Sequence, residues 1–311
     1  MARESDTLNN RFPMSKVSAV IVSYRNEEMT CRYVNEELCK CPEIDHVVIV
    51  NNAATDESNE ALHAAIPNSE VSSGEEYHNS KVTILYNKEN QGFARGNNQG
   101  ARFVDRFIHS EYLLFTNDDI IISDADVISR LIKQRESDGS IGCFAPKILK
   151  SDGSPQGPFA YWSLWRRYGL YTVYPIGMRW FRRVIDKKRA QQSQQIVSGF
   201  YNTLVGCFFM VSRSDFMRAG MMDNRTFLYR EEEILAERLK AIGKRSYCEA
   251  SVSVVHLGGQ SSYKDTKRKY NFVNQTIRDS DRIYYHDYMK YPLWQIRLAQ
   301  NIQKLLCAIF A

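Results

Sequence analysis

The chain of 311 residues is 43% hydrophobic and 25% charged, which is typical of a globular protein with one large domain or two modest ones. Its net charge of +5 is a mild excess without a recognised nucleic-acid-binding signature, so no nucleic-acid partner is expected. No signal peptide is visible, and no apolar run approaches the roughly 20 residues of a spanning helix. We therefore expect a cytoplasmic protein whose seven scattered cysteines are reduced.

The first half of the chain alternates between strands and helices. Strands are predicted at 16–24, 46–52, 81–87 and 111–117, helices at about 28–40, 55–66 and 92–109, and a polar loop at 67–80. This alternation predicts a mostly parallel central sheet flanked by helices on both faces. Ligands bind such sheets beyond the carboxyl ends of the strands. Polar residues at 51–52, 87–90 and 117–119 lie at those ends and should converge on one edge.

The second half is less regular. Within 205–220 we expect a strand and then a short helix, with Ser214 and Asp215 as its N-cap and Gly220 at its end. Apolar residues at helical spacing predict a further helix over 227–245. A last strand begins at 251 and runs into a glycine turn.

Two adjacent carboxylates, Asp118 and Asp119, follow a strand that reads as buried. Two unit charges about 4 Å apart repel by about 4 kcal/mol at an effective dielectric of about 20. Either a cation lies between them, or the pair is a solvated turn. The glycine fingerprints of dinucleotide-binding and P-loop enzymes are missing, which disfavours both classes.

Six segments then occur in a familiar order: VSAVIVSYRNEE, VVIVNNAATDES, NKENQGFARGNNQGA, LLFTNDDI, VGCFFMVSRSDFMRAGMMDNRTFLYREEEILAERLKAIG and VVHLGGQS. Over roughly residues 16–262 the sequence resembles family 2 glycosyltransferases with the GT-A fold, especially bacterial enzymes for O-antigen or capsule sugars, of rhamnosyltransferase type. The resemblance implies an α/β protein of that fold with a C-terminal helical extension.

The resemblance also implies a site for Mg²⁺ or Mn²⁺. The NDD triplet is similar to the metal-binding D-x-D motif of the family, with Asp119 as the direct ligand and Asp118 assisting. Both ions prefer oxygen ligands and are held by one or two carboxylates together with phosphate oxygens. His256 matches a segment that approaches the diphosphate or the metal, and imidazole suits either role.

The segment REEEILAER resembles the family motif E-D-x-D-L-x-x-R, whose acidic pair contains the catalytic base. Glu231 and Glu232 occupy the acidic pair, and Glu232 is favoured as the base with Glu231 second. Ile234 replaces the second aspartate of the pattern, which is a departure. The alternative is a solvated first helical turn stabilised by the helix dipole.

The matching strand ends imply a nucleotide-sugar site, which would consist of Ser23, Tyr24, Asn26, Asn51, Gly92, Arg95, Asn97, Asn117 and Asp118. Asn51 stands where the family usually has aspartate; its amide can bond a base edge but carries no charge. Gly92 would let the backbone pass close to the ligand. Arg95 is the expected partner of the diphosphate.

We expect a polar N-terminal segment (1–15), a glycosyltransferase domain (16–262) and a helical tail (263–311). The domain would comprise a nucleotide-sugar-binding half (16–122) and an acceptor-side half (123–262). An insert at 159–190 mixes aromatic and cationic residues, which suits an anionic membrane surface or sugar stacking. It could equally be a core flap with a solvated basic edge.

In the tail, Trp294, Leu298, Ile302, Leu305 and Ile309 mark one helical face. Three uses of that face stay open: docking on the catalytic domain, a homodimer, or contact with the membrane.

These expectations add up to a metal-dependent, inverting hexosyl- or deoxyhexosyltransferase. It would move a sugar from a nucleotide-diphosphate sugar to a hydroxyl of a saccharide acceptor, lipid-linked, at the inner face of the cytoplasmic membrane during cell-surface polysaccharide synthesis. One alternative is a non-catalytic sugar-nucleotide-binding or scaffold protein. A second is a sugar-phosphate nucleotidyltransferase, which usually has a glycine-rich loop where this chain reads SYRNEE.

Overall fold

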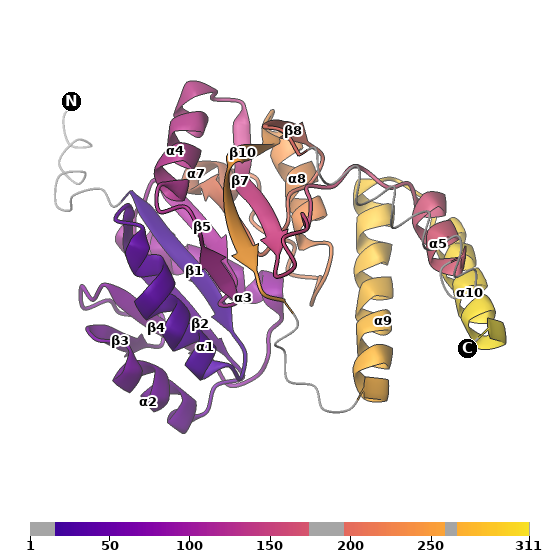
Figure 1. The fold of residues 1–311 in the computed structure, drawn as a ribbon. Coiled ribbons are helices and arrows are strands. Elements are labelled where there is room, and N and C mark those ends of the chain that lie inside the picture. The colour runs from indigo at the N-terminus through magenta and orange to yellow at the C-terminus, as the bar shows by residue number, and fades with distance from the viewer. Residues whose placement is uncertain (1–15, 174–195, 259–265, 311) are drawn as a thin grey trace, which may run out of the picture.

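The apolar runs of the sequence form the strands of one ten-stranded sheet, ordered β3-β4-β2-β1-β5-β9-β7-β10-β6 with β8 beside β10 (Figure 1). The computed structural model describes residues 16–173, 196–258 and 266–310. The expected N-terminal segment 1–15 and the basic stretch 179–189 of the insert lie outside the described residues.

Every element predicted in the first half is confirmed, and β3 is found within the expected loop. The first half contains β1 (Val17–Ser23), α1 (Glu27–Arg32), β2 (Ile44–Asn52), α2 (Asp56–Ala65), β3 (Ser69–Ser72), β4 (Val82–Asn87), α3 (Phe93–Phe103), β5 (Tyr112–Thr116) and β6 (Ile120–Ile122). Helical turns of π or 3-10 type extend α1 to Lys40 and α3 to Ile108.

The second half adds strands to the other side of the sheet and helices beyond it. It contains α4 (Val127–Ser137), β7 (Ile141–Lys150), α5 (Leu164–Val173), β8 (Gly199–Tyr201), β9 (Phe208–Ser212), α7 (Arg213–Arg218), α8 (Glu231–Ala241), β10 (Arg245–His256), α9 (Thr266–Ile283) and α10 (Leu293–Phe310). Strands β3, β4, β2, β1 and β5 are parallel, whereas β9 runs antiparallel to both β5 and β7. The expected mostly parallel sheet is thus confirmed for the first half and becomes mixed beyond β5.

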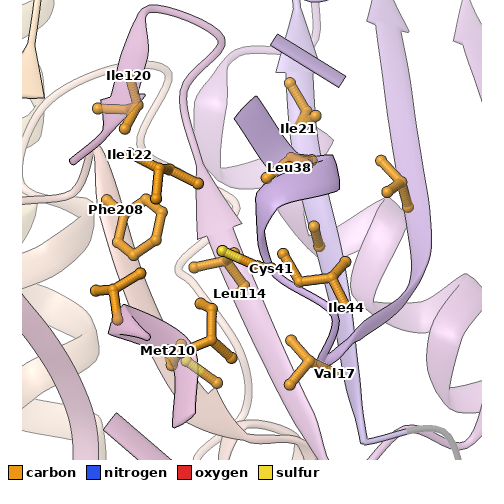
Figure 2. Close-up of a cluster of buried hydrophobic side chains, with 14 of the residues drawn as sticks. Val17, Ile21, Leu38, Cys41, Ile44, Leu114, Ile120, Ile122, Phe208 and Met210 are labelled. Carbon is orange, nitrogen blue, oxygen red and sulfur yellow. The ribbon is translucent and has the colours of Figure 1, made fainter. Parts of the chain in front are cut away.

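Helices bury both faces of the sheet, as the continuous apolar strands predict. Because side chains alternate along a strand, Val17, Ala19 and Ile21 of β1 belong to one core cluster and Val20 to the other. Figure 2 shows the first cluster, in which Leu114 of β5 lies among side chains from β1, β6 and β9. Residues of α1, α2 and α4 complete that cluster, and residues of α3, α7 and α8 complete the other.

The glycines of α3 bring this helix unusually close to the sheet. A Cβ atom on Gly100 would lie 2.5 Å from the side chain of Val20, and one on Gly96 would lie 2.9 Å from that of Val22. The four-residue spacing of these glycines therefore serves helix-to-sheet packing.

The helix predicted after β9 begins at a different residue from the expected one. α7 starts at Arg213, and no side chain caps it at Ser212. Asp215 is instead buried among cations, with oxygens 2.8 Å from Arg218, 3.2 Å from Arg135 and 3.3 Å from Lys244. The cap expectation was wrong because the carboxylate gains more from three charged partners than from the helix terminus.

The tail packs on α5 and α8 through a third core cluster. This cluster consists of Leu164, Tyr168, Ile234, Tyr284, Tyr285, Ile296 and Ala299. Figure 1 shows α9 beside the sheet-containing body and the α5 and α10 pair beyond it, at the outer end of the molecule. Within the described residues, no helix has the length and apolarity needed to cross a bilayer. The cysteines described, namely Cys31, Cys39, Cys41, Cys143, Cys207 and Cys248, are free.

A buried ion-pair network joins the tail to α8. Asp281 of α9 accepts hydrogen bonds from Arg230 Nε at 2.6 Å, Arg167 Nε at 3.0 Å and the Tyr168 hydroxyl at 2.8 Å. Arg230 also pairs with Glu233 and lies 5.0 Å from the ring centroid of Tyr284. The network thereby connects α9 and α5 to the residue that precedes α8.

We predict that Asp281→Ala lowers the free energy of unfolding by about 3–5 kcal/mol, because it removes the buried carboxylate that pairs with both Arg230 and Arg167 and leaves Glu233 as the remaining carboxylate at Arg230. Asp279→Ala is the matched control, since Asp279 lies exposed on the same helix; its effect should stay within about 0.5 kcal/mol. Urea unfolding measures both. Equal effects of the two changes would contradict the role assigned to Asp281.

Candidate functional site

The end of β1 and the NDD triplet meet at one edge of the sheet. Asp118 Oδ2 accepts hydrogen bonds from the Thr30 hydroxyl at 2.8 Å and from the Asn26 amide at 3.2 Å. Ser23 at the end of β1 lies 2.8 Å from the same hydroxyl. Burial raises the pKa of Asp118 above its usual value, an effect that the Thr30 hydroxyl opposes. The end of β1 and the NDD triplet therefore lie together at this edge of the sheet.

Asp119 faces away from these residues, toward β10. β6 pairs antiparallel with β10, with Ile120 opposite His256, and this register brings the Asp119 carboxylate to the imidazole. Asp119 Oδ2 accepts a hydrogen bond from Gly258 N at 3.2 Å. Its Oδ1 lies 3.2 Å from His256 Nε2 but accepts no hydrogen bond, although it is buried.

The surroundings of this oxygen suit a cation. His256 Nδ1 lies 2.7 Å from Gln156 Oε1, and a ring proton on Nδ1 would be donated to this amide oxygen. In that tautomer the lone pair of Nε2 faces Asp119 Oδ1, and a cation between these two acceptor atoms would satisfy both. Neighbouring ligands on an octahedral ion with bonds of about 2.1 Å stand roughly 3.0 Å apart, close to the observed separation.

The protein ligands at this point number fewer than the three that the sequence suggested. Among the described residues, no three His, Cys, Asp or Glu side chains gather to hold an ion by themselves. Asp118 does not join because Thr30 and Asn26 hold its carboxylate. Mg²⁺ commonly binds through one or two carboxylates plus substrate phosphates, so Asp119 and His256 fit a metal that a diphosphate completes.

The second strand end holds a network of amides rather than a charged group. Asn51 donates to Ser58 at 2.8 Å and to Asn59 at 2.9 Å, and so fixes the start of α2. Asn52, which was expected at this edge but not assigned to the nucleotide-sugar site, accepts from Gln91 N at 3.0 Å and donates to Asn90 at 3.0 Å. Its position at the last residue of β2 is the sequence feature that could have assigned it to the site.

Three residues predicted to contact the nucleotide sugar make contacts within the protein. A Cβ on Gly92 would lie 2.4 Å from the Phe227 carbonyl oxygen, so this glycine admits a neighbouring loop. Asn97 donates to the Phe93 carbonyl at 3.0 Å, and Arg95 Nε to the Asn224 carbonyl at 2.9 Å. The loop at 221–227 therefore lies against the start of α3.

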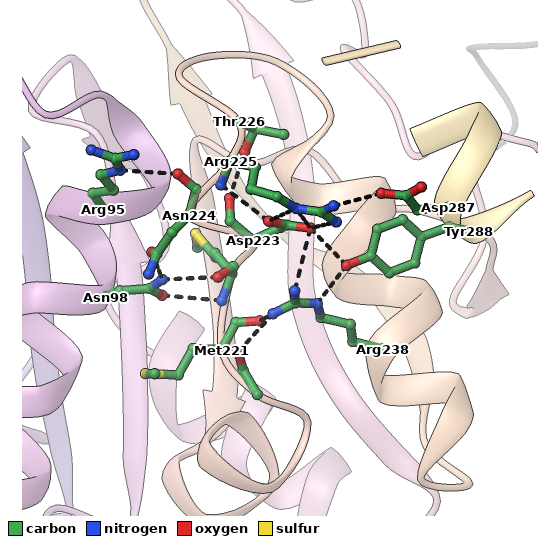
Figure 3. A network of polar contacts seen from close by, with 12 residues as sticks. Arg95, Asn98, Met221, Asp223, Asn224, Arg225, Thr226, Arg238, Asp287 and Tyr288 are labelled. Atoms are coloured by element: carbon green, nitrogen blue, oxygen red, sulfur yellow. Dashed lines mark hydrogen bonds and ion pairs between the residues drawn. The ribbon is translucent and has the colours of Figure 1, made fainter. Parts of the chain in front are cut away.

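That loop is held by a polar network around Asp223, which Figure 3 shows. Arg225 Nη2 lies 2.6 Å and the Tyr288 hydroxyl 2.8 Å from Asp223 Oδ2. Burial alone would raise the pKa of Asp223, but these hydrogen bonds outweigh that effect and keep the pKa well below its usual value. Arg238, the arginine of the acidic motif, donates to the Met221 carbonyl at 2.9 Å. Its role here is to tie α8 to the loop.

The acidic pair lies at the N-terminus of α8 after two strained residues. Tyr229 and Arg230 have φ angles of 73° and 75°, a left-handed conformation that is uncommon outside glycine. Glu231 is 2% exposed, and its Oε1 has no hydrogen-bond partner. Burial, followed by the charge of Glu232, raises the pKa of Glu231 well above its usual value.

Glu232 is held against a glycine. A Cβ on Gly206 would lie 1.9 Å from Glu232 Oε1, so only glycine leaves room for this carboxylate. Burial, followed by the charge of Glu233, raises the pKa of Glu232 to about 7. A carboxyl group with such a pKa can exchange a proton near neutral pH, as general acid–base catalysis requires.

One cleft of about 440 Å³ connects the two acidic regions. Its lining includes Asn117 and His256, which lie close to Asp119, together with Glu231 and Glu232. The remaining wall includes Phe159, Arg167, Leu228, Tyr229 and Ile277, so α5 and α9 contribute to it. The cleft lining does not include Ser23, Tyr24, Asn26 or Asn51, which lie at the ends of β1 and β2.

Comparison with known proteins assigns the family. The sequence profile described as Glycosyl transferase family 2 matches residues 18–218, more than half of the chain. The chain belongs to glycosyltransferase family 2. Residues of α8, β10 and the helical tail lie beyond the stretch that the family 2 profile matches.

A curated relative of this family 2 chain is the low-salt glycan biosynthesis hexosyltransferase Agl10 of Haloferax volcanii. The two are 23% identical over 221 residues, which cover 70% of this chain. The matched stretch spans 60% of the length of the relative.

Solved structures identify the fold as GT-A. GalNAc-T7 with UDP, GalNAc and Mn²⁺ superposes with a TM-score of 0.56 at 12% identity, over 93% of this chain and 55% of that one. Mannosyltransferase PcManGT from Pyrobaculum calidifontis, in complex with GDP-Man and Mn²⁺, superposes with a TM-score of 0.53 at 13% identity. The match covers 96% of this chain and 75% of that one. The expected GT-A fold is therefore confirmed, while the bacterial O-antigen subtype stays a proposal.

In this family 2 glycosyltransferase we predict that Gly206→Ala lowers the initial rate of sugar transfer by about 10- to 100-fold. The new methyl group displaces the carboxylate of Glu232, and misplacement by about 1 Å can cost about 10²-fold. Gly199→Ala is the control, because a Cβ there meets no atom within 4 Å. A wild-type rate in Gly206→Ala at an unchanged melting temperature would argue against a catalytic Glu232.

Proposed function

We propose that this protein is a metal-dependent, inverting glycosyltransferase that moves a hexosyl or deoxyhexosyl group from a nucleotide-diphosphate sugar to a hydroxyl of a saccharide acceptor. The cleft carries this proposal, because its lining includes residues close to Asp119 as well as Glu231 and Glu232. A donor diphosphate and an acceptor hydroxyl must approach one sugar carbon from opposite sides in a single displacement. A cleft that has a cation site for the diphosphate and a general base for the acceptor hydroxyl can hold both groups.

Asp119 and His256 would hold the divalent ion, with Asp118 behind them. When bound, Mg²⁺ or Mn²⁺ neutralises negative charge that develops on the diphosphate leaving group. The main evidence from this chain is the buried Asp119 Oδ1, which accepts no hydrogen bond and faces an imidazole nitrogen. The ends of β1 and β2, with Ser23, Tyr24, Asn26 and Asn51, would bind the nucleoside.

Glu232 would act as the general base. As the acceptor oxygen attacks the anomeric carbon, the bond from that carbon to the diphosphate oxygen breaks and the hydroxyl proton passes to the carboxylate. Glu231 is almost fully buried and its Oε1 has no hydrogen-bond partner, whereas Glu232 is only half-buried and so more open to an acceptor hydroxyl. This difference supports Glu232 over Glu231.

The acceptor would lie against the wall that the insert and tail supply. Phe159 and Tyr229 border the cleft and are partly exposed, and such rings can stack on sugar faces. We further propose a lipid-linked saccharide acceptor at the inner face of the cytoplasmic membrane, in polysaccharide synthesis of the O-antigen or capsule type. The order of sequence motifs and the basic aromatic insert support this finer assignment.

A non-catalytic sugar-nucleotide-binding protein is the second candidate. Asn51 favours this candidate, because it replaces the usual aspartate and its amide donates both hydrogen bonds within the protein, to Ser58 and Asn59. Ile234 favours it as well, because it is buried in the third core cluster where the motif has an aspartate. Catalysis by Glu232 separates the two candidates.

We predict that kcat/KM rises with pH and levels off above a midpoint near 7. The raised pKa of Glu232 means that the base is protonated and inactive at lower pH and becomes available as the pH rises through about 7. Glu232→Gln should reduce the rate by about 10²- to 10⁴-fold and remove this rise, without weakening donor binding.

Glu237→Gln on the same helix is the control for this experiment, because Glu237 pairs with Lys240 on the surface of α8. It should keep both the rate and the pH profile. Full activity of Glu232→Gln would exclude the proposed base.

We predict that Asp119→Asn abolishes the Mn²⁺-dependent thermal stabilisation by a UDP- or GDP-sugar. A ligand at about 100 times its Kd stabilises the folded state by about 2.7 kcal/mol, which a thermal-shift titration detects. Asp152→Asn, an exposed turn residue that bonds Ser154, should leave the stabilisation intact. Undiminished metal dependence in Asp119→Asn would refute the metal assignment.

A further inference from the structure

Helix α10 packs against the protein by one face and exposes a second apolar face. Ile296 and Ala299 are buried in the third core cluster, and Gln300 is buried beside them, donating to Tyr168 at 3.1 Å. On the other side, Trp294 is 63%, Leu298 44%, Ile302 41% and Leu305 62% exposed. The apolar stripe predicted from the sequence is therefore the exposed face of α10, and a different face packs against the rest of the protein.

This outer face is continuous along the helix. At about 100° per residue, the outward positions of Trp294, Leu298, Ile302 and Leu305 fall within an arc of about 80°. Surface helices ordinarily present polar residues there, and α4 does so with Ser129, Arg130, Lys133 and Glu136. Adjoining exposed apolar side chains on a surface helix indicate an interaction site.

The charges around the stripe select the partner. Arg297 and Lys304 are exposed at about 60° and 80° from Trp294 on one edge of the outer face. Residues 288–311 contain no aspartate or glutamate. Two copies of this face brought together would confront cations with cations, whereas an anionic lipid surface complements them and admits the apolar side chains.

The place of α10 in the fold agrees with a surface-lying helix. Figure 1 shows α10 with α5 at the outer end of the molecule, beyond α9. In the part of the chain that the structure describes, no helix can cross a bilayer, so α10 would lie in the plane of the interface. α5 and α9 also supply Arg167 and Ile277 to the cleft, so one helical unit borders both the outer face and the cleft.

We propose that the outer face of α10, defined by Trp294, Leu298, Ile302 and Leu305 with Arg297 and Lys304, docks on an anionic phospholipid surface. The apolar side chains enter the headgroup boundary and the two cations meet lipid phosphates. Docking orients the cleft for a membrane-borne acceptor, and in this respect alone the inference rests on the proposed function.

The test uses the full chain and vesicles of phosphatidylcholine with or without about one third phosphatidylglycerol, at low salt. The wild type should cosediment with the anionic vesicles, and W294S/L298S/I302S/L305S should bind them at least tenfold more weakly. V71S/V197S, which removes two equally exposed apolar side chains elsewhere, is the matched control and should bind like the wild type. R297E/K304E should lose affinity for anionic vesicles even if the serine variant folds poorly.

Three results would overturn the proposal: no binding of the wild type to anionic vesicles, undiminished binding of both α10 variants, or a dimer in sedimentation velocity that the serine variant abolishes. Transfer to a water-soluble acceptor tests the proposed function separately. That activity should be unchanged in the serine variant, so loss of lipid docking and loss of catalysis remain distinguishable.

Discussion

The burial of Glu231 beside the half-buried Glu232 at the start of α8 is the constraint on which the chemistry of the cleft depends. Neighbouring carboxylates removed from water resist ionisation, and the cleft therefore contains a group that can change its protonation near neutral pH. Arg230 supplies the nearby positive charge, and Asp281 of α9 holds this guanidinium in place. The helical tail lies beyond the family profile, yet through Asp281 it holds a residue next to the glutamates that line the cleft.

Much of the fold could be predicted from the sequence, because the relevant signals are local. Apolar runs of strand length, helical spacing between them and polar residues at the strand ends were sufficient to predict the parallel half and its edge. The contact between Asp119 and His256 could be suggested only through the order of family motifs, since 137 residues separate them and the register of β6 and β10 joins them.

Other features depend on long-range contacts that spacing does not encode. The pairing of Arg230 with Asp281 links residues 51 positions apart, and neither residue stands out in its own segment. Gly92 was predicted to let the backbone pass close to the ligand, and its spacing gave no sign that it also makes room for the Phe227 carbonyl. An apolar stripe such as that of α10 has the same spacing whether it faces a core or the outside, so only the structure could tell that it is exposed.

The central claim is that a cation at Asp119 and the base Glu232 lie on opposite walls of one cleft that binds the donor sugar. A crystal of the protein with Mn²⁺ and a bound nucleotide-diphosphate sugar tests it most directly, through the anomalous signal of manganese. We predict an anomalous peak at the Asp119 carboxylate, with the anomeric carbon of the sugar turned toward Glu232. Manganese bound away from Asp119, or a sugar that leaves Glu232 on an unconnected surface, would contradict it.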